Sequence, residues 1–167
     1  MSRKDRLGRP PEMLTAPGYF LRRLQQAYQA AWTVSVDPVV TSQQHAVLLA
    51  VHRHPGMEQG LIGESVSLDR STMAGVVDRL EKREWLTRER PALDGRKRLL
   101  YLTTDGRKQM ESVLERSRQL EAALMEGYGP LGQEMIVSML ANLADKWESV
   151  ASGKGTDDAP DALLEAD

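Results

Sequence analysis

Five basic residues lie close together between Thr87 and Arg98, and this clustering favours phosphate binding. Glu89 and Asp94 are the acidic residues of this stretch, so it carries a local charge of +3 in a chain whose formal net charge is −2. Lysine and arginine neutralise nucleic-acid phosphates, and a guanidinium can bind two phosphate oxygens at once. The basic residues are Arg88, Arg90, Arg96, Lys97 and Arg98.

Asp94 and Arg96 have a spacing that predicts a second kind of contact. An aspartate two residues before an arginine can hold the guanidinium by a charge-assisted hydrogen bond. An arginine oriented in this way is suited to a narrow minor groove, where the negative potential is enhanced. A surface ion pair with no DNA contact remains the alternative for these two residues.

A helix predicted from Asp69 to Lys82 supplies a second candidate nucleic-acid surface. Met73, Val76, Val77 and Leu80 repeat at helical spacing and should face the core. The opposite face begins with small and polar side chains that can approach base edges and phosphates, and Asp69 is the expected N-cap. An ordinary solvated face is the alternative. The residues expected to contact DNA are Arg70, Ser71, Thr72, Ala74, Gly75 and Arg79.

The elements that must position these surfaces are predicted to be mainly helical. Apolar periodicity and capping signals predict helices at about 17–36, 41–53, 58–65, 69–82, 103–128 and 131–151. Residues 86–90 and 98–102 read as a two-stranded hairpin that leans on the helices through Leu86, Leu100 and Leu102. Two helices followed by a basic hairpin, the wing, form the layout of a winged helix-turn-helix, which we place at about 41–102.

The flanking segments predict a dimer. The helices at 17–36, 103–128 and 131–151 carry apolar stripes that the small central unit does not account for, so we expect them to form a dimerisation layer. Two wings and two helices would then read a pseudo-palindromic DNA site. A monomer that buries the same stripes internally is the alternative. Residues 1–16 are expected to be a flexible basic arm, 17–151 a single domain, and 152–167 a disordered acidic tail.

Several classes of protein are disfavoured by what the sequence lacks. There is no cysteine, no run of 18 apolar residues, and no apolar stretch behind the basic N-terminus, so we expect a cytoplasmic protein without disulfides. A phosphate-binding glycine loop, a nucleophile elbow and an HExxH motif are absent, so neither an enzyme nor a cofactor is expected. His45, His52 and His54 are expected to be structural or surface residues rather than metal ligands.

Taken together, these motifs resemble those of the multiple-antibiotic-resistance regulator (MarR) family, over roughly residues 17–151. The resemblance implies a homodimer with two winged helix-turn-helix lobes, which usually represses nearby genes and leaves DNA when a small ligand binds. The residues that carry it are Thr41-x-x-Gln44, Leu68-Asp69-Arg70-Ser71-Thr72, Val77-Asp78-Arg79-Leu80-Glu81, Asp94-Gly95-Arg96 and Leu102-Thr103-x-x-Gly106.

Three positions depart from the family's common pattern. The family often has glycine where Glu84 stands, so the turn into the wing is expected to differ. Leu61-Ile62-Gly63-Glu64 replaces a small, Leu-Ala-rich segment. Gly75 stands where a longer polar side chain is common, which removes one candidate base reader and costs helix propensity.

The first predicted helix resembles a subgroup of the family that controls breakdown of aromatic acids or their coenzyme A thioesters, through Leu21-Arg22-Arg23 and Gln25-Gln26. A pocket lined by Tyr19, Tyr28, Trp32 and His45 would hold the effector. Arg22 or Arg23 would pair with its carboxylate or phosphate. The alternative is that the aromatic residues are core or dimer residues and both arginines are solvated.

The expected function is therefore a ligand-responsive, homodimeric, DNA-binding repressor. Phosphate contacts are expected from Arg70, Ser71, Thr72, Arg88, Lys97 and Arg98, with Arg96 in the minor groove. An aromatic carboxylate or acyl thioester is expected to release the operator. The alternative is a protein-interaction module, similar to an anti-repressor, on the same fold. Such a module has no need for the clustered basic charge of the wing.

Overall fold

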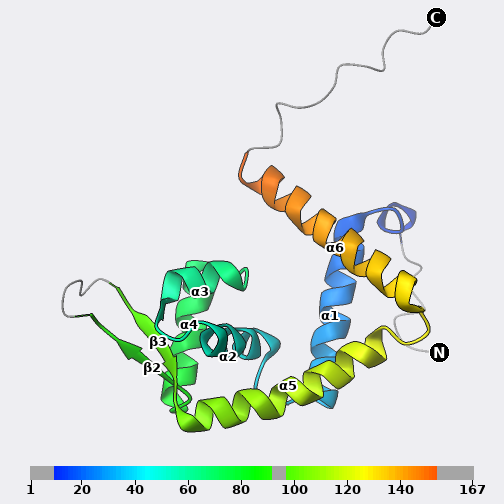
Figure 1. The fold of residues 1–167 in the computed structure, drawn as a ribbon. Coiled ribbons are helices and arrows are strands. Elements are labelled where there is room, and N and C mark those ends of the chain that lie inside the picture. The colour runs from blue at the N-terminus through cyan, green and yellow to red at the C-terminus, as the bar shows by residue number, and fades with distance from the viewer. Residues whose placement is uncertain (1–9, 92–96, 154–167) are drawn as a thin grey trace, which may run out of the picture. The chain divides into compact units, whose positions relative to one another are not determined.

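The computed structural model describes residues 10–91 and 97–153 (Figure 1). Helices dominate it, together with one small sheet, as the sequence predicts. The elements are α1 (Pro17–Ser35), α2 (Ser42–Arg53), β1 (Met57–Glu58), α3 (Gln59–Ser65), α4 (Arg70–Lys82), β2 (Leu86–Glu89), β3 (Leu99–Leu102), α5 (Thr104–Leu124) and α6 (Pro130–Ala151).

The chain divides into two compact units between Glu121 and Ala122. The first unit contains α1 to β3 and most of α5, and the second contains the end of α5 and all of α6. The helix-turn-helix and the wing therefore belong wholly to the first unit.

The core of the winged-helix lobe is formed by the apolar faces of α2, α3, α4 and the sheet. The predicted inward face of α4 is confirmed, since all four of its apolar residues are buried. Leu86 and Leu100 bury the wing against the same core, with Leu102 packed beside them. The fully or nearly buried cluster consists of Val47, Leu48, Val51, Ile62, Met73, Val76, Val77, Leu80, Leu86, Leu100 and Met110.

The sheet has three strands rather than the two predicted, in the order β1-β3-β2 and antiparallel throughout. The additional strand is β1, whose Met57 pairs with Leu100. Gly56 makes this possible, because it adopts a φ of +76° and donates its N–H to the Leu100 carbonyl at 2.9 Å. A strand of two residues is too short to show alternation, so no periodic pattern in the sequence predicts it.

The turn from α4 into β2 keeps the geometry of a glycine turn although Glu84 occupies it. Glu84 has a φ of +59°. Its N–H donates to the Glu81 carbonyl at 2.8 Å, and the Trp85 N–H donates to the Leu80 carbonyl at 3.0 Å. These two bonds form a Schellman motif. The expectation that glutamate would change this turn was therefore wrong: the backbone conformation is retained, and Glu84 occupies an unfavourable region of φ/ψ space.

The Thr103-x-x-Gly106 motif docks α5 onto that turn. The Thr103 hydroxyl donates to the Glu84 carbonyl at 2.7 Å and accepts from the Gly106 N–H at 2.9 Å. A Cβ on Gly106 would lie 1.8 Å from the Trp85 carbonyl oxygen. Gly106 is therefore required because two backbone segments pass in direct contact.

In the second unit, α5 ends four residues before the predicted boundary at Tyr128. The residues that follow Leu124 form tight turns, with N–H bonds from Met125 to Ala122 and from Glu126 to Ala123. Gly127 then takes a φ of +86°. The apolar stripe of α6 leaves its large residues exposed in the single chain: Leu131, Met135, Met139, Leu140, Leu143, Trp147 and Val150. A partner surface for this stripe stays a prediction.

The two ends of the chain are only partly covered by the structure. Pro11–Met13 forms a short 3-10 turn within the segment expected to be a flexible arm. The rest of that arm, residues 1–9, and all but the first two residues of the predicted acidic tail lie outside the described residues. Across 10–91 and 97–153, no helix is long and apolar enough to span a membrane.

Candidate nucleic-acid interface

The N-terminus of α4 is fixed by Asp69, as predicted. Oδ1 of Asp69 accepts from the N–H groups of Ser71 and Thr72, both at 2.9 Å. The carboxylate also accepts from the hydroxyl groups of these two residues, each at 2.6 Å. These bonds, those from the hydroxyls first, lower the pKa of Asp69 well below its ordinary value. The cap therefore stays ionised and ordered at neutral pH.

This cap determines what Ser71 and Thr72 can offer to DNA. Because both hydroxyls donate to Asp69, their remaining capacity is that of acceptors. An acceptor at the start of a groove-binding helix suits the amino groups of adenine and cytosine. These two residues are thus better suited to base edges than to phosphates, which need donors.

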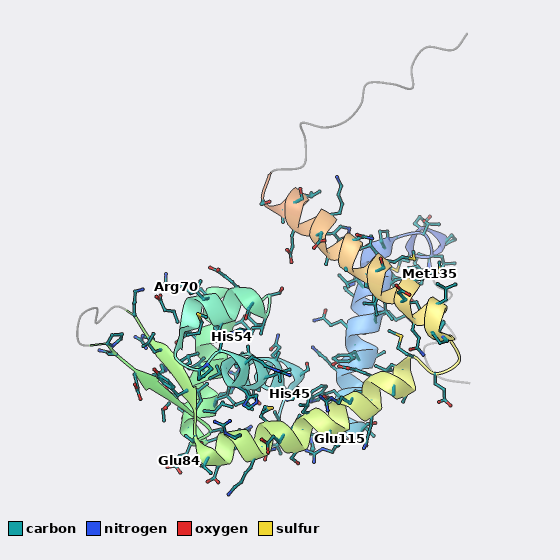
Figure 2. All side chains as sticks on the ribbon, in the orientation of Figure 1. His45, His54, Arg70, Glu84, Glu115 and Met135 are labelled. Atoms are coloured by element: carbon teal, nitrogen blue, oxygen red, sulfur yellow. The ribbon has the colours of Figure 1, made fainter. Side chains whose placement is uncertain are left out.

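The outward face of α4 is otherwise small and open near its start. Arg70 and Arg79 are exposed, and Figure 2 shows Arg70 near the beginning of the helix and Glu84 beyond its end. A Cβ on Gly75 would lie 3.5 Å from Nη1 of Arg79, an ordinary contact distance. Packing therefore does not require glycine at position 75. Because Gly75 has no side chain, nothing projects from the helix surface at this position beside Arg79.

An open groove of about 720 Å³ lies between α3, the start of α4 and the stem of the wing. Five of the residues predicted to bind DNA line this groove, namely Arg70, Ala74, Arg88, Lys97 and Arg98. Three carboxylates also line the groove, so its charge is mixed rather than purely basic. The lining residues are Glu58, Gln59, Gly60, Gly63, Glu64, Leu68, Arg70, Met73, Ala74, Asp78, Arg88, Lys97 and Arg98.

Arg88 is not presented to solvent as the predicted phosphate contact requires. Its side chain is only 15% exposed and forms ion pairs with Asp78 and Glu81 of α4. The physical reason is strand alternation: Arg88 lies on the same face of β2 as buried Leu86, so it points towards the helix.

The remaining basic residues of the wing are placed differently. Arg98 is exposed beside β3, while Lys97 pairs with Glu58 of β1. Asp94 and Arg96, and therefore the predicted minor-groove pair, lie outside the described residues.

Three of the predicted effector residues form one aromatic group in the first unit. Trp32 is 4% exposed and His45 is 6% exposed, with ring centroids 5.6 Å apart, and Tyr28 lies 6.0 Å from Trp32. Burial lowers the pKa of His45 and raises that of Tyr28. Nδ1 of His45 is buried without a hydrogen-bond partner among the described residues.

The other three predicted effector residues do not join this group. Tyr19 packs edge-on against Phe20, with centroids 5.3 Å apart. Arg22 and Arg23 are exposed on α1. Ten residues of helix separate Arg22 from Trp32, a rise of about 15 Å. One small pocket on this chain therefore cannot contain all six residues.

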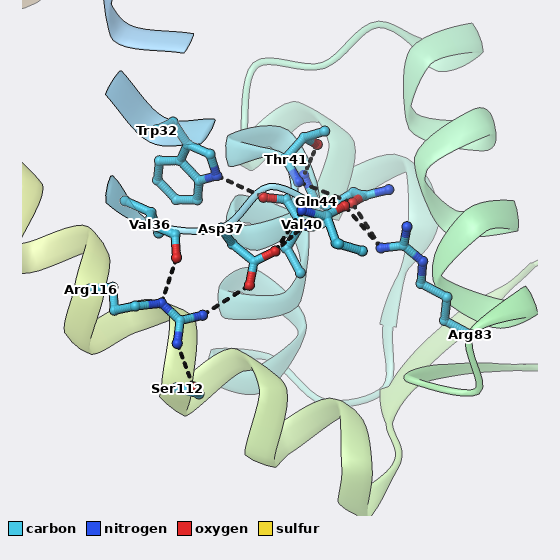
Figure 3. A network of polar contacts seen from close by, with 10 residues as sticks. Trp32, Val36, Asp37, Val40, Thr41, Gln44, Arg83, Ser112 and Arg116 are labelled. Atoms are coloured by element: carbon cyan, nitrogen blue, oxygen red, sulfur yellow. Dashed lines mark hydrogen bonds and ion pairs between the residues drawn. The ribbon is translucent and has the colours of Figure 1, made fainter. Parts of the chain in front are cut away.

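The loop between α1 and α2 is held by a polar network that the sequence did not reveal (Figure 3). Asp37 accepts from the N–H groups of Val39 and Val40, each at 2.7 Å, and pairs with Nη2 of Arg116 at 2.9 Å. Trp32 donates to the Val40 carbonyl at 2.7 Å. The loop is therefore fixed by α1 and α5 together.

Arg83 extends this network to the end of α4. Its Nη1 donates to the Val39 carbonyl at 3.2 Å and approaches Oε1 of Gln44 at 3.5 Å, and its guanidinium lies 5.0 Å from the Trp85 ring centre. Gln44 also completes a capping box with Thr41 at the start of α2. Residues from four helices are thus linked around one loop, a long-range arrangement without a local sequence signal.

No group of three or more histidine, aspartate or glutamate residues in the described part of the chain is arranged to hold a metal ion. His45 is buried in the core, His52 lies 3.4 Å from an Arg107 nitrogen, and His54 caps the end of α2 (Figure 2).

A capped helix with an open face, followed by a three-stranded wing with basic residues at its stem, defines a winged-helix DNA-binding protein. The sequence model of the MarR family matches residues 40–97 of this chain, from the start of α2 to the residues just before β3. The chain belongs to the MarR family, whose members are transcription regulators and not enzymes.

Relatives match well beyond the winged-helix lobe. The PcaV transcriptional regulator of Streptomyces coelicolor, solved in complex with its natural ligand, is 35% identical, has a TM-score of 0.79, and aligns over 83% of this chain and 98% of its own. The transcriptional repressor CouR, solved on a 23-mer DNA duplex, is 29% identical with a TM-score of 0.74, over 83% and 99% of the two chains. A second CouR structure contains p-coumaroyl-CoA, with 29% identity, a TM-score of 0.73 and coverage of 81% and 96%.

The regulator HosA of Escherichia coli O157:H7 is 28% identical over 123 residues, which are 74% of this chain and 90% of HosA. The similarity of this chain to its relatives thus includes the helices that flank the winged-helix lobe.

Proposed function

We propose that this regulator is a homodimeric repressor that binds a pseudo-palindromic operator and is released by an aromatic acyl thioester or the corresponding free acid. The observation that carries the DNA part is the open, capped start of α4 beside the basic stem of the wing. CouR, which shares this fold, has been solved on a DNA duplex, and that supports the same mode of binding here.

In this proposal each subunit places the start of α4 in a major groove. Ser71, Thr72, Ala74 and Gly75 face base edges, and exposed charges contact the backbone. The pair Asp94 and Arg96 acts in the adjacent minor groove. The residues proposed for phosphate contact are Arg70, Arg79, Lys97 and Arg98.

The dimer is proposed to form through the flanking helices, in a single domain of residues 17–151. The apolar stripe of α6 is exposed in the single chain, as are Phe20, Leu21 and Leu24 of α1. Exposed apolar surface on this scale is typical of a protein interface. Two lobes held in this way read half-sites about one helical turn apart.

The effector site is proposed to begin at the group of Tyr28, Trp32 and His45. The buried Nδ1 of His45, which has no hydrogen-bond partner within residues 10–91 and 97–153, offers a hydrogen bond to a polar group on an aromatic ring. Arg22 lies about 15 Å from Trp32 towards the N-terminus of α1, and its side chain is about 80° around the helix axis from that of Trp32. Arg23 lies about 180° around the axis from Trp32. A coenzyme A thioester is long enough to reach both Trp32 and Arg22, which favours it over a small acid.

The response to the effector is proposed to travel through the loop between α1 and α2. Trp32 holds the Val40 carbonyl, and Arg83 joins the neighbouring Val39 carbonyl to the end of α4. A ligand that moves the Trp32 ring would therefore change the support of α4, the proposed recognition helix, and disfavour the DNA-bound arrangement.

Fluorescence anisotropy on DNA from upstream of the coding sequence, with a scrambled duplex as competitor, tests the DNA part. We expect selective binding that weakens steeply with salt, and a reduced salt dependence in Arg98→Ala. Equal affinity for both duplexes would contradict the DNA part for that site, and a random-sequence selection would then search for another.

A panel of aromatic acids and their coenzyme A thioesters tests the effector part. We expect a thioester to lower the affinity for DNA and to change tryptophan fluorescence. Arg22→Ala should weaken the response, and Arg23→Ala is the matched control because it faces away. The effector hypothesis fails if no compound shifts DNA affinity.

A further inference from the structure

Arg88 occupies an inward position of the wing. It is opposite Leu100 in the pairing of β2 with β3, and directly paired residues of antiparallel strands lie on the same face of the sheet. Leu100 is fully buried, so this face is the one packed against the lobe. The polar head of Arg88 is therefore directed at α4 rather than at solvent.

Two carboxylates of α4 receive this guanidinium. Nε of Arg88 donates to Oε2 of Glu81 at 2.6 Å, Nη2 approaches the same oxygen at 2.5 Å, and Nη2 also donates to Oδ1 of Asp78. Asp78 and Glu81 are three residues apart and so share one face of the helix. We call these three residues the wing latch. It joins α4 directly to β2.

The latch is stronger than an exposed ion pair. Arg88 is 15% exposed and Glu81 is 32% exposed, so solvent screens their contact only in part. Three donor contacts from one planar guanidinium also fix an orientation, which a single point charge does not. The wing stem is thus tied to α4 by a contact of defined geometry.

Charge alone and the geometry of the wing latch predict opposite effects on DNA affinity when the carboxylates are neutralised. Asp78 is 57% exposed and lines the groove that holds Arg70 and Arg98. A carboxylate there repels phosphates, so its neutralisation should tighten DNA binding if charge alone mattered. If the carboxylates hold the wing in place, their neutralisation should instead weaken DNA binding.

We propose that Arg88 is a positioning residue: held by Asp78 and Glu81, it sets the wing against the recognition helix so that both can enter adjacent grooves at once. This inference rests on the proposed DNA-binding mode. Because the wing latch forms in the free protein, DNA binding does not have to order the wing. Such preorganisation raises affinity for DNA. Arg88 itself makes no phosphate contact.

The test compares Arg88→Met with Arg98→Met on the selected DNA site, across a salt series. Arg88→Met should lose about tenfold or more in affinity, the equivalent of a charged hydrogen bond, with an unchanged salt slope. Arg98→Met, the variant of a proposed phosphate ligand, should reduce the slope by about 0.9 per subunit. An equal reduction of the slope by both variants would overturn the proposal.

Neutralising Asp78 and Glu81 tests the latch more directly than replacing Arg88, because charge alone predicts the opposite result. The double variant Asp78→Asn, Glu81→Gln should also weaken binding, although it removes negative charge from a DNA-binding face. Adding Arg88→Met to it should cause no further loss, because the three residues act as one unit. Tighter binding by the double variant would show that the carboxylates only repel DNA, and would refute the latch.

A measurement without DNA separates this proposal from the proposed function. Amide hydrogen exchange of the free protein should accelerate in β2 and β3 of Arg88→Met, while α2 keeps its protection. Unchanged exchange in both strands overturns the latch whatever the DNA result. If Arg88→Met shows this exchange pattern but the wild-type protein prefers no duplex, the proposed function is contradicted and the latch is not. Arg88→Lys, which keeps the charge but not the fork, should give an intermediate loss of protection.

Discussion

Replacing Glu84 with glycine should stabilise the protein, because the turn between α4 and β2 has a conformation that glycine adopts without strain. Glu84 has a φ of +59° and an exposed side chain that forms no hydrogen bond within the described residues. Its carbonyl, which every residue type retains, accepts from Thr103. The substitution therefore changes backbone freedom without removing a side-chain hydrogen bond of the described residues.

The expected magnitude follows from two opposing effects. A residue with a Cβ in the left-handed region costs about 1–2 kcal/mol relative to glycine. Glycine also makes the unfolded chain more flexible, which costs about 0.4–1 kcal/mol. We therefore expect Glu84→Gly to raise the free energy of unfolding by about 0.5–1 kcal/mol. For a protein of this size that is a rise in Tm of about 1–4 °C.

Urea and thermal denaturation followed by circular dichroism, at one fixed protein concentration, would measure this change. Glu84→Ala is the matched control, since it removes the same side chain but keeps a Cβ in the strained conformation. We expect it to be close to wild type. If Glu84→Gly were no more stable than Glu84→Ala, the assignment of strain to this turn would be wrong.

Three further outcomes are expected. Gly106→Ala should lower the free energy of unfolding by about 3 kcal/mol or more, because its Cβ would lie 1.8 Å from a backbone oxygen, and a loss below about 1 kcal/mol in a denaturation curve would contradict this close approach. Asp69→Ala should be less stable than wild type at neutral pH by an amount that shrinks below about pH 4: the pKa of Asp69 is lowered on folding, so its stabilisation is present above the unfolded value and is lost as pH falls. Burial lowers the pKa of His45, so folding favours the neutral ring, and stability should fall as pH drops below about 6.5. His45→Gln should flatten that slope in urea titrations, whereas exposed His54→Gln should leave it unchanged.

Much of the candidate site could be read from local sequence. The spacing of Met73, Val76, Val77 and Leu80 identified the buried face of α4, and the outward face follows once the buried one is known. Asp69 was identified as the N-cap of α4, and Thr41-x-x-Gln44 lies at the start of the helix predicted from residue 41, which is α2. These features depend on residues within one or two turns of each other.

The effector residues show where this reasoning stops. Tyr28, Trp32 and His45 were expected to lie together, and they do, because Tyr28 and Trp32 are one turn apart and α2 packs beside them. Tyr19 and Arg22 share a helix with Trp32 but not a small pocket, since helix length separates them. Two residues on the same helix are therefore not necessarily close together, and their spacing along the helix is the better guide to the distance between them.

The sequence by itself determined the helices and the two hairpin strands of this protein, the buried face of its recognition helix and the Asp69 cap, because short-range periodicity and backbone hydrogen bonding set them. Only the tertiary structure decided that Arg88 pairs with Asp78 and Glu81, that β1 joins the sheet, and that Arg83 reaches the loop between α1 and α2. Each of these joins residues that are distant in the chain or on different elements. Such contacts depend on how the elements pack, which no local pattern encodes.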